Sequence, residues 1–156
     1  MIKTKQFKYT PKELFSLLTM RFIKKRWWLL AWIWILAIVL IIIDNHDSYA
    51  YFMCGLSILF PSILAIQFWR LVNSKGNKLL LYPRFYEIDN NKISGIIDED
   101  THSTTKLEHF IKAEFIRNTY LLFIAKNHVI YIPADSFESD DDRKWFESEI
   151  INKIKK

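Results

Sequence analysis

The sequence has few of the residues that build common catalytic and ligand-binding sites. Its 156 residues include three glycines and one cysteine. So little glycine leaves little scope for a loop that cradles phosphate, and no G-x-G-x-x-G, P-loop, G-x-S-x-G or H-E-x-x-H pattern occurs. The single cysteine, Cys54, excludes an intramolecular disulfide and a multi-cysteine metal site. These absences count against the familiar enzyme classes, and the sequence predicts no cofactor.

Charge is missing from two long stretches of the chain. Residues 27–43 and residues 49–69 contain no Asp, Glu, Lys or Arg. A bilayer core about 30 Å thick is crossed by roughly 17–25 apolar helical residues, so each stretch is long enough to span it. The polar residues 44–48 separate the two stretches. The sequence therefore predicts a membrane α-helical hairpin of two transmembrane helices over residues 27–72, with spans at 27–43 and 49–69.

Three other interpretations of these stretches stay open. Ser48-Tyr49-Ala50 resembles the cleavage site of a secretory signal peptide, although a second apolar stretch follows it at once. Two buried core helices of a soluble protein would need a covering shell that so short a chain hardly supplies. The third alternative is one span followed by a re-entrant segment.

Basic residues flank the two stretches on one side only. The segment between the stretches has no Lys or Arg. Because basic flanks are retained in the cytoplasm, we expect both termini to be cytoplasmic and the short polar segment to face outward. The basic residues that we expect at the inner membrane surface are Lys24, Lys25, Arg26, Arg70, Lys75 and Lys78.

The net charge of +5 is a property of these flanks. Residues 1–26 and 69–78 are strongly basic, whereas residues 79–156 have a small excess of acids. A nucleic-acid-binding protein would carry the basic surface on its soluble part. We therefore expect the lipid bilayer, and no nucleic acid, as the partner of the basic residues.

Residues 1–26 predict a basic N-terminal arm and an amphipathic helix that enters the membrane. Residues 1–9 lack a helical period, which favours an extended arm. Thr10, Pro11 and Glu13 have the order of an N-cap, a first helical residue and a capping-box partner. The helix that follows either lies on an anionic inner leaflet or serves only as the basic flank of the first span.

Residues 79–156 predict a small α+β cytoplasmic domain that follows a linker at residues 73–77. Residues 98–105 are expected to form a polar turn, and residues 107–116 are either strand or short helix. Ser139 as N-cap, followed by three aspartates, predicts a C-terminal helix that docks on a sheet. The strands are expected at residues 79–89, 93–97, 120–125 and 129–132, the last two forming a β-hairpin.

Residues 119–137 (TYLLFIAKNHVIYIPADSF) resemble the C-terminal signature of the YcxB-like family of small bacterial membrane proteins. There a YLLY-x-s-x-n-x-x-I-I-P-x-x-x-F hairpin precedes an acidic-capped helix, and the layout is a basic N-terminal helix, two spans and a β-rich cytoplasmic domain. The resemblance implies a pleckstrin-homology-like antiparallel β-barrel capped by a C-terminal helix, at a bacterial cytoplasmic (inner) membrane. It implies no activity. This chain has Leu107-Glu108-His109-Phe110 where the family often has a tryptophan.

Two clusters of polar residues leave metal or acid–base chemistry open. His102 and His109 lie near Glu99, Asp100 and Glu108 in the sequence, although solvated turn residues are the simpler interpretation. The aspartates at 140–142 are better explained as a helix cap than as a metal site, since no other ligands stand at suitable spacing.

The sequence favours a membrane-anchored, non-enzymatic interaction or regulatory module with a protein or peptide partner at the inner face of a bacterial membrane. One alternative is an immunity protein that protects the cell against a membrane-active peptide. The other is an enzyme acting on membrane substrates, which would depend on His102, His109 or Glu108.

Overall fold

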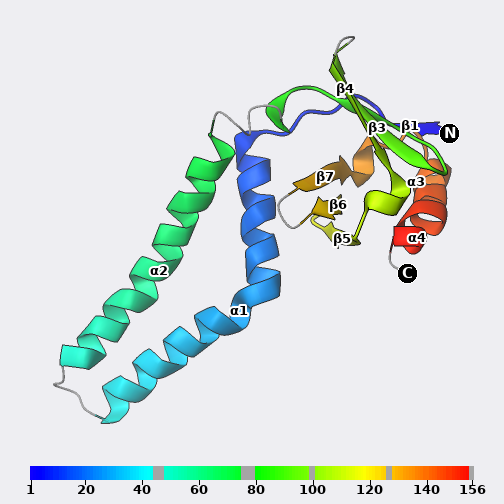
Figure 1. Ribbon diagram of the computed structural model, residues 1–156. Helices are drawn as coiled ribbons and strands as arrows, with labels where there is room; N and C mark the ends of the chain where they lie inside the picture. Colours follow the sequence, from blue (N-terminus) through cyan, green and yellow to red (C-terminus); the bar gives the residue numbers. More distant parts are fainter. Residues whose placement is uncertain (44–47, 75–79, 99–100, 126–127, 155–156) are drawn as a thin grey trace. The chain divides into compact units, whose positions relative to one another are not determined.

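The computed structural model describes residues 1–43, 48–74, 80–98, 101–125 and 128–154 (Figure 1). The chain divides into two compact units, each described here by itself. The helical unit is Thr10–Lys78, and the β unit combines Met1–Tyr9 with Leu79–Lys156. The chain therefore has two long apolar helices and a small antiparallel β domain with a C-terminal helix, as the sequence predicts at this level of detail.

Helix α1, Pro11–Ile43, begins at the predicted capping box. The backbone N–H of Thr10 donates to Glu13 Oε2 at 2.8 Å, and the N–H of Glu13 donates to Thr10 Oγ1 at 3.2 Å. The helix is interrupted once, at Arg26, whose φ of −134° and ψ of 20° are not helical. Figure 1 shows the resulting bend. It falls where the basic flank meets the uncharged stretch that begins at residue 27.

Helix α2, Ser48–Val72, continues through Pro61 and packs along α1 in the opposite direction. Aromatic rings meet edge to face near the charged ends of the pair, with centroids 5.8 Å apart for Phe15 and Trp69 and also for Phe22 and Phe68. The pair is thus held partly by aromatic contacts outside the uncharged stretch of α1.

Small residues lie at the helix–helix contact, as is common when helices pack closely in membranes. Ala37 and Ser57 are buried. The Ser57 hydroxyl donates to the Cys54 carbonyl at 2.7 Å, so its polar group is satisfied within α2. A Cβ added to Gly55 would have no atom within 4 Å, so Gly55 is not a point of close approach.

The β unit contains two antiparallel sheets among its described residues. Residues 101–105, expected to be a turn, instead belong to strand β4, because polar β-branched residues suit an exposed strand that pairs with β3. The first sheet has the order β1 (Ile2–Lys3), β2 (Phe85–Ile88), β3 (Lys92–Asp98) and β4 (Thr101–Lys106). The second has the order β5 (Lys112–Ile116), β6 (Thr119–Ala125) and β7 (His128–Pro133).

The ambiguous region at residues 107–116 contains both kinds of structure. Leu107–His109 is a 3₁₀ turn, η2, and Lys112–Ile116 is strand β5. A two-residue turn joins β5 to β6, and both of its residues have positive φ, 48° at Arg117 and 58° at Asn118. Such turns match the twist of the paired strands. The predicted hairpin of β6 and β7 is confirmed, although residues 126–127 lie outside the described part.

The N-terminal nine residues are an extended segment of the β unit. The sequence predicts one N-terminal segment over residues 1–26, but the structure divides it at residues 9 and 10. β1 pairs with β2, the N–H of Lys5 donates to the Ser136 carbonyl at 2.6 Å, and the N–H of Tyr86 donates to Thr4 Oγ1 at 2.8 Å. Pairing satisfies backbone groups that would otherwise need water.

The C-terminal helix begins at the predicted cap and changes its winding midway. Ser139 Oγ accepts from the backbone N–H of Asp142 at 3.1 Å. The chain is α-helical over Asp140–Trp145 (α3), π-helical over Phe146–Ile151 (η4) and helical again over Asn152–Ile154 (α4). The predicted apolar row of Phe146, Ile150 and Ile154 is buried in one core with β2, β3, β6 and β7.

Gly95 in β3 allows the Tyr86 ring to lie directly against the neighbouring backbone. A Cβ at position 95 would stand 2.7 Å from Cε1 of the buried Tyr86 ring. We expect Gly95→Ala to lower the free energy of unfolding by about 1–3 kcal/mol, because the ring has to move within a packed core. Urea unfolding of the full chain in micelles measures this change. Ser94→Ala is the matched control, and an equal loss there would show that the Tyr86 contact is not the cause.

Candidate interaction groove

A groove of about 500 Å³ lies between strand β5 and the C-terminal helix, within the β unit. We call it the β5 groove. Its strand side is formed by residues 113–115 and Tyr120, and its helix side by Lys144, Glu147, Ser148, Ile151 and Asn152. Apolar, charged and hydroxyl groups therefore all reach it.

Strand β5 is an edge strand of its sheet. Among the described residues it pairs with β6 alone. Ile116 and Thr119 face each other across the two-residue turn and so close the hairpin as a hydrogen-bonded pair. Bonded pairs recur at every second residue of an antiparallel ladder. The backbone N–H and C=O groups of Ala113 and Phe115 therefore point away from β6, along the groove.

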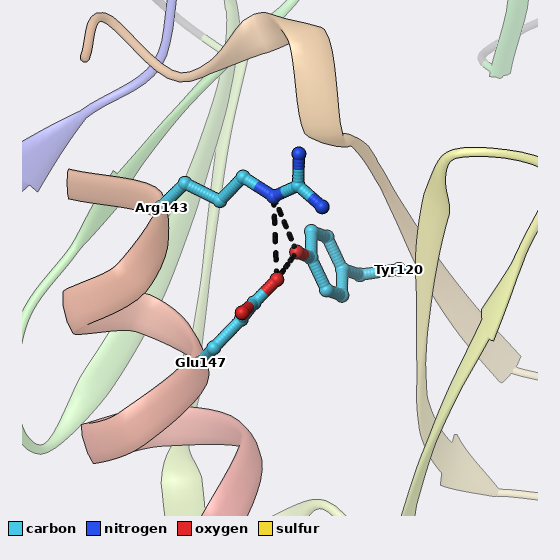
Figure 2. Close-up of polar contacts among 3 residues, drawn as sticks. All are labelled: Tyr120, Arg143 and Glu147. Atoms are coloured by element: carbon cyan, nitrogen blue, oxygen red, sulfur yellow. Dashed lines mark hydrogen bonds and ion pairs between the residues drawn. The ribbon is translucent and has the colours of Figure 1, made fainter. Parts of the chain in front are cut away.

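Three polar side chains form a connected cluster at the groove (Figure 2). The Tyr120 hydroxyl donates to Glu147 Oε1. Arg143 Nε lies 3.0 Å from the Tyr120 hydroxyl oxygen and 3.2 Å from Glu147 Oε1, so one N–H serves both acceptors. Tyr120 comes from β6, whereas Arg143 and Glu147 stand four residues apart on α3 and η4. The cluster thus ties the helix to the sheet beside β5.

Aromatic packing fixes the ring of Tyr120 in this cluster. Its centroid lies 4.7 Å from that of Phe115, 5.2 Å from that of Phe146 and 6.1 Å from that of Phe137. The Arg143 guanidinium carbon lies 5.9 Å from the Phe115 centroid, within the range of a cation–π contact. Phe115 remains 45% exposed, so part of its ring is open to solvent.

Burial is the main reason that the Tyr120 pKa is raised to about 12, and the hydrogen bond to Glu147 acts in the same direction. The phenol therefore stays protonated and keeps donating to Glu147 throughout the physiological range. The hydrogen bond to Tyr120 is also the main reason that the Arg143 pKa is raised. Tyr120 and Arg143 are suited to holding a fixed arrangement, since the pKa of each is moved further from neutrality and away from acid–base work.

The raised pKa of Tyr120 makes the β unit sensitive to alkaline pH. A phenol whose pKa is higher in the folded than in the unfolded state contributes stability that is complete below the unfolded value of 10.0 and is lost as pH rises through about 12. We expect Tyr120→Phe to remove this one-proton loss of stability between these values. Urea unfolding of both proteins across that pH range measures it. Parallel pH profiles would contradict the assignment, and Tyr82→Phe, which alters an exposed tyrosine, is the control.

The π-helical segment η4 widens the helix at the groove. The N–H of Asn152 donates to the Glu147 carbonyl, five residues back. Glu147, Ser148 and Ile151 all belong to this segment and all line the groove. π-helical turns are uncommon and occur frequently at functional sites. This local winding is a second observation that marks the same place in the molecule.

The sequence-predicted basic residues lie elsewhere, in the helical unit. Lys24 and Lys25 are exposed on α1, Arg26 is at its bend, and Arg70 is in the last turn of α2. Lys75 and Lys78 lie outside the described residues. Where they are described, these side chains border the uncharged stretches of the two helices, which is compatible with a role as membrane flanks.

The histidines considered for metal or acid–base chemistry are on separate elements. His102 is in β4, and His109 is in η2, where its Nε2 lies 3.8 Å from Glu108 Oε1. Within the described residues no group of three His, Cys, Asp or Glu side chains is placed to hold a metal ion. Glu99 and Asp100 lie outside that part of the chain.

Sequence reasoning missed the β5 groove and its polar cluster. The spacing of Arg143 and Glu147 is a visible signal, since residues four apart share a helix face. Tyr120 and Phe115 gave no such signal, because only the pairing of β5 with β6 brings them side by side. Compared with models of known protein families, with curated proteins and with solved structures, the chain matches none.

Proposed function

We propose that this chain is a membrane-anchored, non-enzymatic interaction module at the inner face of a bacterial membrane, where its β unit meets a protein or peptide partner. The observation that carries this proposal is the apolar surface of the helices. α1 and α2 are long and apolar enough to cross a membrane, and 6% of each apolar window is buried within the chain. Core helices of a soluble protein bury such surfaces, whereas lipid covers them in a membrane protein.

The direction of insertion follows from the basic flanks. Exposed Lys24 and Lys25 stand just before the bend of α1, where its uncharged stretch begins, and Arg70 stands in the last turn of α2. The other ends of the two uncharged stretches have no basic residue among those described. With the positive flanks inside, the β unit and both termini are cytoplasmic. The absence of familiar catalytic motifs in the sequence supports a binding role rather than a catalytic one.

A pleckstrin-homology-like barrel is the architecture that we propose for the β unit. The support is the make-up of the unit: a four-stranded antiparallel sheet whose first strand, β1, precedes α1 and α2 in the sequence, a three-stranded antiparallel sheet, and the C-terminal helix. The resemblance of residues 119–137 to the YcxB-like signature points in the same direction. Edge strands and loops of such small sheets are natural places for partner binding.

Reporter fusions after Lys156 test the location and orientation. A fluorescent protein that matures only in the cytoplasm is expected to be bright at the membrane, and alkaline phosphatase at the same position is expected to be inactive. Washing the membranes with alkaline carbonate is expected to leave the chain in the pellet. An active phosphatase fusion, or release into the supernatant, would overturn the proposal.

Crosslinking of the full chain in intact membranes tests the interaction role. A photo-reactive residue placed at exposed positions of the β unit is expected to yield a defined adduct that disappears when crosslinkers are placed in α2 instead. If the chain protects the cell from a membrane-active peptide, deletion should instead sensitise cells to that peptide without any adduct on the β unit.

A further inference from the structure

The two uncharged stretches of the helical unit differ in length. At about 1.5 Å per helical residue, residues 27–43 extend for roughly 26 Å and residues 49–69 for roughly 31 Å. A hydrocarbon core is about 30 Å thick, so the stretch of α2 matches it and the stretch of α1 is shorter. One end of the α1 stretch therefore brings the neighbouring charged residues close to the boundary of the core.

The contacts between the helices show that this happens at the bend of α1. The Phe22 ring contacts that of Phe68, near the end of the α2 stretch, with centroids 5.8 Å apart. Because the helices run in opposite directions (Figure 1), residues that follow Phe22 lie beside residues that precede Phe68. Lys24, Lys25 and Arg26 therefore stand beside the uncharged stretch of α2. When that stretch spans the core, these cations lie at its boundary, where lipid phosphates begin.

The helices supply no negative charge beside these basic residues. Residues 14–43 and 48–86 contain no Asp or Glu, and Glu13 caps the start of α1. Lys24 and Arg26 are exposed, and neither has an ion pair or a hydrogen bond with another described residue. Both cations are therefore available to an anion from outside the helices.

Two exposed tryptophans follow directly and indicate which kind of anion fits. Trp27 is 62% exposed and Trp28 is 50% exposed. Tryptophan is enriched at the level of lipid headgroups, because its ring is apolar and its indole N–H can donate a hydrogen bond. Cations beside exposed indole rings match a phosphate that carries acyl chains, whereas a small soluble anion makes no use of the rings.

We propose that the bend of α1 binds the headgroup of an anionic phospholipid of the inner leaflet. Lys24 and Arg26 contact its phosphate, and the rings of Trp27 and Trp28 pack against the upper part of its acyl chains. We call these four residues the bend site. The inference rests on the proposed membrane location and goes beyond it, since basic flanks that only orient a helix need no preference for one lipid at one place.

Tryptophan fluorescence of the full chain in phosphatidylcholine vesicles tests this inference. Brominated acyl chains quench nearby indoles, so brominated phosphatidylglycerol is compared with brominated phosphatidylcholine at equal fractions of the total lipid. We expect an about tenfold preference for phosphatidylglycerol in quenching, because each cation near the surface favours anionic lipid. Equal quenching by the two lipids would overturn the inference.

Neutral substitutions test whether the preference belongs to the bend site. Lys24→Gln/Arg26→Gln is expected to abolish it. Lys106→Gln/Lys153→Gln is the matched control, because it removes two exposed positive charges from the β unit, and it should retain the preference. Equal losses in the two double variants would show a response to net charge alone and contradict the site. Lys24→Arg/Arg26→Lys keeps both charges and is expected to retain the preference.

The native chain decides the question if the neutral double variant fails to insert. Inorganic phosphate, compared with chloride at equal ionic strength, is expected to leave the preference unchanged. Its loss in phosphate would assign the site to a soluble anion and overturn the inference. A chain that stays in the pellet after the carbonate wash but is quenched equally by both lipids would overturn the bend site and leave the proposed function standing.

Discussion

Ile35→Arg is expected to weaken membrane insertion of the first span by about 3–4 kcal/mol, which is more than a hundredfold in the insertion equilibrium. Ile35 lies near the middle of the uncharged stretch 27–43 and is 50% exposed, so an arginine there would face lipid. Leucine-type side chains favour insertion slightly, whereas arginine at a span centre opposes it strongly. The fraction of chain that integrates into microsomal membranes, read from engineered glycosylation sites, measures the effect.

Ile43→Arg is the matched control for that substitution. It makes the same chemical change on the same helix, but Ile43 is the last residue of α1 and is 75% exposed. An arginine at a helix end extends its charged group to the interface, so we expect little loss of insertion. Equal losses at the two positions would show that depth in a bilayer is not what matters, and the proposal of a spanning helix would fail.

Phe146→Ala is expected to destabilise the β unit by about 3–5 kcal/mol, a large part of the stability of a domain of this size. Phe146 is completely buried and contacts the rings of Tyr120 and Phe137, with centroids 5.2 and 5.1 Å away. Removing it leaves a cavity where the C-terminal helix docks on the sheets. Urea unfolding of the full chain in micelles, followed by near-ultraviolet circular dichroism, measures the loss.

Phe115→Ala controls for the loss of an aromatic ring as such. Phe115 is 45% exposed and contacts Tyr120 and Arg143 at the surface, so its removal leaves no closed cavity. We expect a loss of stability below about 1.5 kcal/mol. If Phe115→Ala were as damaging as Phe146→Ala, the core would extend across β5 and the groove would be a packing element instead of a ligand surface.

Local patterns predicted the helices of this protein well. The capping box at Thr10 and Glu13 and the cap at Ser139 both form, because each depends on residues within one turn. The apolar row of Phe146, Ile150 and Ile154 is buried, since its spacing places the three on one face. The strand at residues 101–106 was missed, because its polar residues resemble a turn and only pairing with β3 makes them a strand.

The candidate site depends on contacts between residues far apart in the sequence. Tyr120 meets Glu147 only because the C-terminal helix folds back over β6, and the groove exists only because β5 ends its sheet. The position of residues 1–9 in the β unit also depends on distant contacts. Nothing in an extended basic segment indicates which strand it will pair with. The periodicity of residues within one segment does not predict such pairings.

The sequence by itself determined that two long uncharged stretches form helices, that basic residues flank them, and that strands and a capped helix follow. Charge and hydrophobic spacing decide these features, and both are local properties of the chain. Only the tertiary structure decided the division at residue 9, the free edge of β5, and the joining of Tyr120, Arg143 and Glu147 beside it. Those depend on which strands pair and where the helix docks, and pairing is chosen by the burial of the whole core.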